Sequence, residues 1–143
     1  MSLPRSMAMQ FLPLLSLLAL TACAADAAPG HGLSGTAWRF LKIDGMEAVA
    51  HGTRLEFRDG NLGANVGCNG MGGPWRVEDD RLIAGPLAQT EMYCEGAVWD
   101  QEKAVGALLA AAPSVEWRDD RLILRSSGHD AELERISHTA EAE

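Results

Sequence analysis

Basic residues, cysteines and aromatic residues are all scarce in this chain. Its 143 residues include 12 Lys and Arg against 20 Asp and Glu, which gives a formal net charge of −8. No cluster of basic residues offsets the acidic excess. Because an acidic surface repels phosphate, the composition argues against nucleic acid binding and against electrostatic docking on anionic lipid. Membrane attachment would therefore need a covalent lipid.

The residue patterns of common catalytic and metal sites are also missing. The glycine-rich stretch Gly67–Gly73 is not followed by Lys-Ser or Lys-Thr, so it does not form a phosphate-binding loop. No pair of acids stands out as a general acid and base. None of the histidines is spaced from the cysteines as in a zinc site, and we expect them in exposed loops: His31, His51, His129 and His138. We therefore predict no catalytic residue, no metal and no cofactor, and hence a protein that is not an enzyme.

The N-terminus has the layout of an export signal. Arg5 precedes Met7–Leu20, a run that is apolar except for two residues and is too short for a comfortable membrane span. Leu20-Thr-Ala-Cys23 follows at once and resembles a lipobox, in which a peptidase cuts before a lipid-modified cysteine. We interpret residues 1–22 as a lipoprotein signal peptide and Cys23 as the lipidation site. Ordinary secretion, with cleavage within Ala22-Cys-Ala24, is the alternative.

A short tether would follow the lipid. Residues 23–32 are mostly small and include Pro and Gly, which is typical of a linker, and nine extended residues span only about 30 Å. Ala24 rather than Asp follows the cysteine, which favours the outer membrane by resemblance to enteric sorting signals. The expected location is the cell envelope, lipid-anchored, on the outer membrane facing the periplasm.

Residues 33–136 are long enough for one domain, and short strands dominate its pattern. A single segment changes to helical spacing, Ala97–Ala112, and Pro113 stops it. Gly67–Gly73 is predicted to be a loop, and residues 137–143 a disordered tail. The strands are expected at Thr36–Ile43, Arg54–Arg58, Leu62–Cys68, Trp75–Val77, Leu82–Thr90, Ser114–Trp117, Leu122–Arg125 and Ala131–Ile136. The predicted fold class is α+β and β-rich: an antiparallel sheet or partly open barrel with one helix packed against it.

Three hairpins share one pattern, a large apolar residue followed by four polar or turn residues and then Leu. The pairs are Phe57 with Leu62, Val77 with Leu82, and Trp117 with Leu122. If the central two residues form each turn, the two apolar residues lie opposite each other on one face. Asp-Asp is a poorer turn pair than Asp-Gly, so the second and third loops are expected to be longer than two residues.

One ordered set of residues resembles the META domain, or HslJ-like, family of heat-shock-associated lipoproteins. It consists of Gly67, Cys68, Asn69, Gly73 and an aromatic at Trp75, then Thr90, Met92 and Cys94. The family more often has Tyr where this chain has Trp75. The resemblance covers residues 33–136 and implies a compact antiparallel β structure with one helix. It implies envelope roles in stress response, drug tolerance or secretion, and no established enzymatic activity.

Each motif residue allows a structural and a functional interpretation. Cys68 and Cys94 could form a disulfide, remain two buried thiols, or act as reactive or metal-binding thiols. Asn69 could cap a turn, or the glycine-rich loop around it could contact a ligand. Thr90 and Met92 are expected to point into the core. An exposed Trp99 would indicate a groove that faces a partner or lipid.

Three functional hypotheses follow. The first is a lipid-anchored, non-enzymatic binding or scaffold protein in envelope stress tolerance or secretion-related assembly, with an envelope protein or an apolar ligand as its partner. The second is an inhibitor of a cell-wall hydrolase such as lysozyme, because a cationic enzyme would be attracted to an acidic protein. The third is a thiol-dependent enzyme that uses Cys68 or Cys94.

Overall fold

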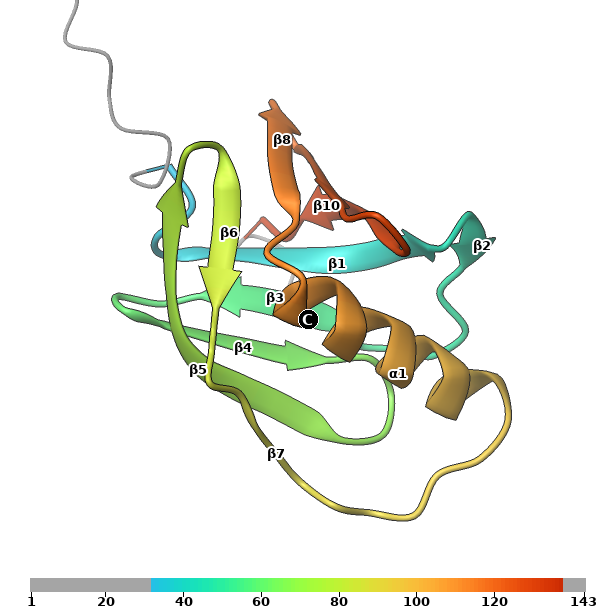
Figure 1. Ribbon diagram of the computed structural model, residues 1–143. Coiled ribbons are helices and arrows are strands. Elements are labelled where there is room, and N and C mark those ends of the chain that lie inside the picture. Colours follow the sequence, from blue (N-terminus) through green and yellow to red (C-terminus); the bar gives the residue numbers. More distant parts are fainter. Residues whose placement is uncertain (1–31, 138–143) are drawn as a thin grey trace, which may run out of the picture.

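The computed structural model describes residues 32–137. The signal peptide 1–22, Cys23, the linker up to residue 31 and the tail from residue 138 lie outside the described residues. Eight antiparallel strands close into a barrel, and one helix packs against it (Figure 1). The barrel strands are β1 (Thr36–Ile43), β3 (Arg54–Phe57), β4 (Asn61–Asn65), β5 (Gly70–Glu78), β6 (Arg81–Ala84), β8 (Ser114–Arg118), β9 (Arg121–Arg125) and β10 (Asp130–Arg135). The prediction of an antiparallel, β-rich fold with one packed helix is confirmed.

Two unequal seams close the barrel. The first and last strands pair over most of β1, from Trp38 opposite Arg135 to Ile43 opposite Ala131. The seam between β6 and β8 is much narrower, with Arg81 opposite Ser114 as its single residue pair. Two short strands lie beside the barrel: β2 (Met46–Glu47) pairs with β1, and β7 (Ala88–Gln89) pairs with β5.

All three predicted hairpins form with the predicted partners. Phe57 lies opposite Leu62, Val77 opposite Leu82, and Trp117 opposite Leu122. In each pair the Leu is at most 3% exposed, so the hairpins extend the core as expected.

The two Asp-Asp turns are tighter than the sequence suggested. Glu78 lies directly opposite Arg81, and Arg118 opposite Arg121, which leaves two residues in each turn. The expectation of longer loops was therefore wrong. Asp79 and Asp80 both take positive φ, 48° and 57°, a backbone conformation that Asp tolerates better than most residues.

Apolar side chains from the strands fill the inside of the barrel. Trp38 and Leu33 are both fully buried, and the indole nitrogen of Trp38 donates to Oγ1 of Thr36 at 2.7 Å. The other most deeply buried strand side chains come from β3, β6, β9 and β10: Leu55, Phe57, Leu82, Leu122, Leu124 and Leu133. The barrel interior is thus a packed core.

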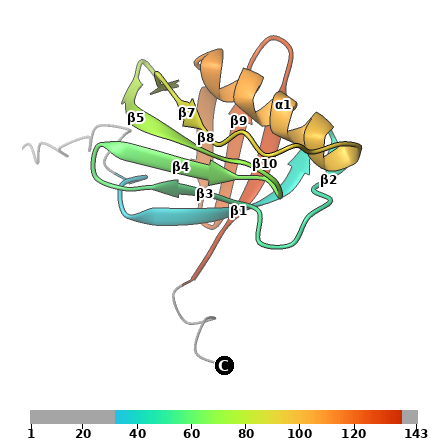
Figure 2. The same ribbon diagram turned by 90° about the horizontal axis from the view of Figure 1, so that it is seen from below.

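Helix α1 (Ala97–Ala110) covers one end of the barrel, as Figures 1 and 2 show from two directions. Val105, Leu108 and Leu109 are at most 1% exposed and join the core. The helix ends two residues earlier than predicted, because Ala112 takes a positive φ of 49° ahead of Pro113. A residue before proline is disfavoured in the helical region.

The predicted loop Gly67–Gly73 is wrong at its second half, since β5 begins at Gly70. This part of β5 contains glycines because other backbone segments approach the strand too closely to leave room for a side chain. A Cβ at Gly73 would lie 2.3 Å from the carbonyl oxygen of Pro86, and one at Gly72 would lie 2.9 Å from that of Leu62. Glycine inside a strand often marks such a close approach.

The predicted strand Leu82–Thr90 is also interrupted. Its first part is β6 and its second part is β7, with a cis Gly85-Pro86 peptide bond between them. The ladder with β5 is interrupted here, because proline cannot donate a ladder hydrogen bond, and it resumes where β7 pairs with Met71 and Gly72. Among the described residues, no helix is both long and apolar enough to cross a membrane.

The opening turn of the domain and the start of the helix lie at opposite ends of β1. In both views the turn before β1 is on the left, whereas β2 and the N-terminus of α1 are on the right (Figures 1 and 2). The eight residues of β1 separate these ends by about 26 Å at 3.3 Å per residue.

Candidate functional site

Six of the eight family motif residues converge at the edge of α1: Gly67, Cys68, Asn69, Thr90, Met92 and Cys94. Cys68 comes from the connection between β4 and β5, and Cys94 from the segment that leads into α1. A disulfide joins them, with 6.4 Å between the Cα atoms. The disulfide interpretation of the two cysteines is the one that the structure supports. In this state the two sulfurs are bonded to each other, and neither is a thiolate.

Asn69 is the centre of the polar cluster beside this disulfide. It is 1% exposed. Its Oδ1 accepts from the hydroxyl of Thr90 at 2.9 Å and from the backbone amide of Met92 at 2.7 Å. Its Nδ2 donates to the carbonyl of Met92 at 3.1 Å and approaches Sγ of Cys94 at 3.4 Å. One side chain therefore holds the whole Thr90–Cys94 segment against the start of β5.

Glu102 closes the cluster from the helix side. This carboxylate is also 1% exposed, and it accepts from the backbone amide of Asn69 at 2.8 Å and from its Nδ2 at 2.9 Å. A third donor is Nε2 of Gln89, at 2.6 Å. A buried carboxylate is stable only when it is well hydrogen-bonded, and these donors meet that need.

Gln101 ties two further loops to the helix. Its Nε2 donates to the carbonyl of Val66 before β5, and its Oε1 accepts from the amide of Val49 at 3.1 Å. Gly67 fits under this part of the helix because it has no side chain: a Cβ there would lie 2.5 Å from that of Ala50. Within the described residues, no buried side-chain nitrogen or oxygen lacks a hydrogen-bond partner.

Two predictions concern individual motif residues. The side chain of Asn69 hydrogen-bonds Thr90 and the backbone of Met92, and not a turn of its own loop as the capping interpretation expected. Thr90 and Met92 do not point into the core, because both are exposed and Met92 retains 59% of its surface. Instead, the hydroxyl of Thr90 and the backbone of Met92 form hydrogen bonds with the side chain of Asn69. Trp75 packs edge-on against Phe57, and its indole donates to the carbonyl of Arg58 at 2.8 Å.

Sequence reasoning missed Gln101 and Glu102 altogether. The apolar stripe of the helix runs from Val98 to Val105 and beyond, and these two residues occupy its positions three and four residues after Val98. Polar residues at positions where the helical period requires burial are the signal that could have revealed them. Trp99 lies off this stripe and is 37% exposed, and Nζ of Lys103 lies 5.6 Å from its ring centroid.

The same cluster contains the potential metal ligands of residues 32–137. Donor atoms of Cys68, Cys94 and Glu102 lie within 4.8 Å of one another. In the disulfide the two sulfurs are bonded to each other, and the carboxylate is occupied by protein donors. These three residues therefore connect α1, and the segment that precedes it, to the barrel.

A pocket of about 340 Å³ opens on the other side of the helix, between α1 and β2. It combines apolar side chains with carboxylates. The lining residues are Ile43, Asp44, Met46, Glu47, Val49, Ala97, Asp100, Gln101 and Ala104. Met46 and Val49 keep 70% and 56% of their surface exposed, which is unusual for large apolar residues beside a hollow.

The carboxylate of Asp44 at this pocket has a perturbed pKa. Burial raises its pKa, but hydrogen bonds from the Asp130 amide and from His129, together with the charge of His129, outweigh that effect and hold the pKa below its ordinary value. One Asp44 oxygen lies 2.8 Å from Nδ1 of His129. Asp44 is therefore a carboxylate anchored in its charged form at the rim.

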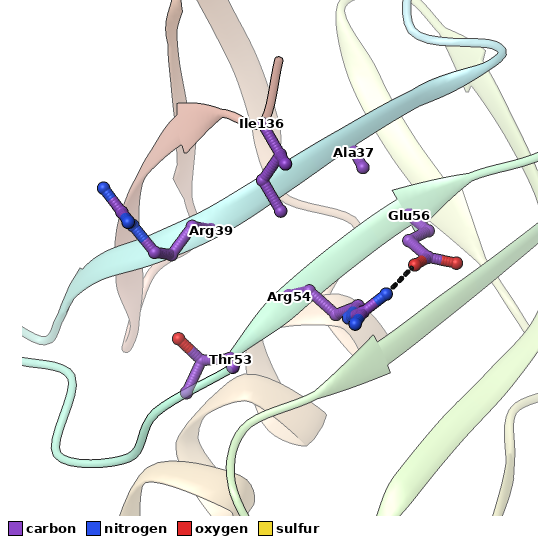
Figure 3. A pocket seen from close by; sticks show the side chains of 7 residues that line it. Ala37, Arg39, Thr53, Arg54, Glu56 and Ile136 are labelled. Atoms are coloured by element: carbon purple, nitrogen blue, oxygen red, sulfur yellow. Dashed lines mark hydrogen bonds and ion pairs between the residues drawn. The ribbon is translucent and has the colours of Figure 1, made fainter. Parts of the chain in front are cut away.

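A second pocket, of about 250 Å³, lies on the outer face of β1 and β3 beside Ile136 (Figure 3). Its charged side chains are paired with each other or with neighbours. Arg54 donates to Glu56 at 2.7 Å, and this hydrogen bond is the first cause of a lowered pKa of Glu56. Arg39 pairs with Glu134. Because these charged side chains already form ion pairs within the protein, this pocket provides fewer charged groups for a ligand than the pocket beside α1.

The closed eight-stranded barrel and its fastened helix define the class of this protein as a small antiparallel β-barrel domain. The META domain family matches residues 31–138, which is most of the chain, and the chain belongs to this family. No curated protein matches the chain significantly.

Two solved structures share the fold. One NMR structure is 16% identical, covers 72% of this chain and 91% of its own, and has a TM-score of 0.65. An NMR structure of a protein from Burkholderia xenovorans is 18% identical, covers 94% of this chain and 99% of its own, and has a TM-score of 0.61. At these identities the likeness concerns the fold alone.

Proposed function

We propose that this META-domain protein is a lipid-anchored, non-enzymatic binding protein of the bacterial cell envelope. The observation that carries the proposal is the Cys68–Cys94 disulfide, which fastens the segment before α1 to the barrel. Disulfides persist in oxidising compartments outside the cytoplasm. This agrees with the export signal and the lipobox-like sequence that ends at Cys23.

The way the barrel is built supports binding on its outside. The interior is filled by the core, and Asn69 and Glu102 use their polar groups within the protein. A partner would therefore bind to the outer surface of the barrel, chiefly at the pocket between α1 and β2. In this proposal the rigid barrel presents that pocket at the periplasmic face of the outer membrane, in envelope stress tolerance or secretion-related assembly.

Metabolic labelling tests the anchor. Wild-type protein and the variant Cys23→Ala are expressed in a bacterial host with radiolabelled palmitate, and the cells are fractionated. We expect label in the wild-type protein, which sediments with the membranes, and none in the variant. An unlabelled wild-type protein that remains in the cytosol would contradict the proposal.

The acidic charge supports a second candidate, inhibition of a cationic cell-wall hydrolase. The chain has 20 acidic against 12 basic residues, and complementary charge speeds association. The purified protein is mixed with lysozymes, and lysis of cell-wall suspensions is followed together with complex formation by gel filtration. Slower lysis and a co-eluting complex are expected if this candidate is right, whereas unchanged rates and separate peaks would dismiss it.

A further inference from the structure

The pocket between α1 and β2 has an apolar floor and an acidic rim. We propose that it binds small cationic amphiphiles, with the apolar body against Met46 and Val49 and the cationic group at the carboxylates. This inference rests on the proposed binding function and names its ligand class.

The apolar side of the argument starts from exposed surface. Met46 and Val49 line the pocket with most of their surface exposed to water, and Ile43, at 4% exposure, lines it as well. A ligand that covers the first two would gain about 25 cal/mol for each Å² of apolar surface removed from water. Ala97 and Ala104 form the helix side of the same pocket, and their short side chains leave room for an incoming group.

The carboxylates at the rim of the pocket favour a ligand with a positive charge. Asp44, Glu47 and Asp100 come from the β1–β2 turn, from β2 and from α1, and all three line the pocket. The cations that face them are His129, 2.8 Å from Asp44, and Lys103, 3.0 Å from Asp100. Lys42 lies opposite Glu47 in the β1–β2 pair, and its ion pair is with Glu132 at 3.9 Å. Among the described residues Glu47 makes no ion pair. An ammonium group would therefore find at least one carboxylate that has no partner, whereas an anion would be repelled.

The pocket is preformed because its floor is tied to the helix. Gln101 bonds the backbone of Val49 and that of Val66, so the β2–β3 connection cannot swing away from α1 without breaking these bonds. A preorganised pocket loses little conformational freedom on binding, which favours affinity for a small ligand.

The size of the pocket indicates a small molecule. At about 30 Å³ for a group the size of water, 340 Å³ holds roughly eleven such groups. That suits a short alkyl chain with its head group, and it lies at the lower end of small-molecule pockets. β2, whose residues line the pocket, lies at the end of β1 opposite the turn that precedes β1 (Figure 1).

The test uses three probes with the same tail. Hexyltrimethylammonium, hexyl sulfate and hexyl glucoside are titrated below their micelle concentrations into the exported chain that carries Cys23→Ala. Binding is followed by calorimetry and by amide chemical shifts. We expect saturable one-to-one binding of the cation, with shifts at Met46, Val49 and Ala97, and affinities at least threefold lower for the other two probes.

Matched variants locate the site. Glu47→Gln is expected to weaken cation binding about threefold to tenfold, with less effect at high salt. Met46→Ser/Val49→Ser is expected to weaken it at least tenfold. The exposed Glu78, at the far hairpin, supplies the control Glu78→Gln, which should bind as the wild type does. All the substituted residues are exposed, so circular dichroism should show unchanged folding.

Several results would overturn the inference. These are no saturable binding, equal binding of all three probes, or cation binding that Glu47→Gln and Met46→Ser/Val49→Ser leave unchanged. Binding of a basic amphipathic peptide without binding of the cation, or a dimer in sedimentation that Val49→Ser disrupts, would assign the pocket to a macromolecular partner instead. None of these outcomes bears on palmitate labelling, so the lipid anchor and the ligand class can fail separately.

Discussion

The carboxylate of Glu102 on α1 accepts hydrogen bonds from both the backbone amide and the side-chain amide of Asn69, at 2.8 and 2.9 Å. Both residues are 1% exposed. This contact joins the helix to the start of β5, and the disulfide lies next to it. Asn69 and the two cysteines of the family motif therefore take part in attaching the helix to the barrel, and the stability of the fold should depend on these contacts.

Replacing Glu102 with Ala should destabilise the protein by about 3–5 kcal/mol, because the buried donors of Asn69 and Gln89 would lose a charged acceptor. Urea unfolding at neutral pH, followed by fluorescence, measures the change. Glu91→Ala is the control, since Glu91 is exposed nearby and should change the free energy of unfolding by less than about 0.5 kcal/mol. Similar effects of the two variants would refute the central role of Glu102.

Removing the disulfide in Cys68→Ser/Cys94→Ser should lower stability by about 3–4 kcal/mol in the chain-entropy treatment, since it closes a loop across a sequence separation of 26 residues. The comparison is made by urea unfolding of oxidised wild type, reduced wild type and the variant. The last two should agree within about 1 kcal/mol, because the Asn69–Glu102 contacts remain. A variant as stable as the oxidised protein would show that the crosslink is dispensable.

Gly73→Ala should destabilise the protein by about 1–3 kcal/mol, the usual cost of overpacking. Its Cβ would lie 2.3 Å from the carbonyl oxygen of Pro86, which is backbone and cannot move aside cheaply. Gly63→Ala in the adjacent strand is the matched control, because a Cβ there meets nothing within 4 Å. Thermal unfolding distinguishes them, and equal melting temperatures would mean that Pro86 does not press on β5.

The turn between β5 and β6 can be improved. Asp79 and Asp80 both have positive φ, and Asn-Gly is the preferred pair for such a turn. Asp79→Asn/Asp80→Gly should therefore stabilise the protein by about 0.5–1 kcal/mol. Asp59→Asn provides the comparison, since in that turn Gly60 already takes the positive φ. No gain over Asp59→Asn in urea unfolding would argue against this account of the turn.

Acid should weaken the protein partly through Asp44. Because its pKa is lowered in the folded state, its contribution is present above the unfolded-state value of about 3.9 and is lost as the pH falls through the folded-state pKa. Asp44→Asn lacks this pH-dependent contribution. The difference in unfolding free energy between wild type and variant should therefore be largest at neutral pH and should approach zero in acid. Urea unfolding between pH 7 and pH 2 measures it, and a difference that does not change with pH would contradict the prediction.

Local signals predicted much of the fold correctly. Thr36–Ile43 coincides with β1, and the three apolar pairs across the hairpins lie where the turn spacing placed them. Period and turn chemistry act over a few residues, so they can be read without the rest of the chain. The loop prediction at Gly70–Gly73 failed for the opposite reason, because Gly73 makes room for Pro86, which approaches from another part of the chain.

The candidate site depended still more on long-range contacts. The sequence singled out Asn69, Thr90, Met92 and Cys94 as a set, and it kept a disulfide open for Cys68 and Cys94. It did not indicate that Glu102 would be their acceptor, because that contact spans 33 residues. Nor could it show that Met46 and Val49 would face the helix across a pocket.

The amino-acid sequence alone determined the strand and helix order, the hairpin pairs, the acidic charge and the resemblance at the motif, since each is encoded in neighbouring residues. Only the tertiary structure decided that the barrel closes, that Glu102 is buried against Asn69, and that an apolar pocket with an acidic rim lies between β2 and α1. These features arise where segments distant in the chain meet. Their energies come from burial and hydrogen bonds between such segments, which no local pattern records.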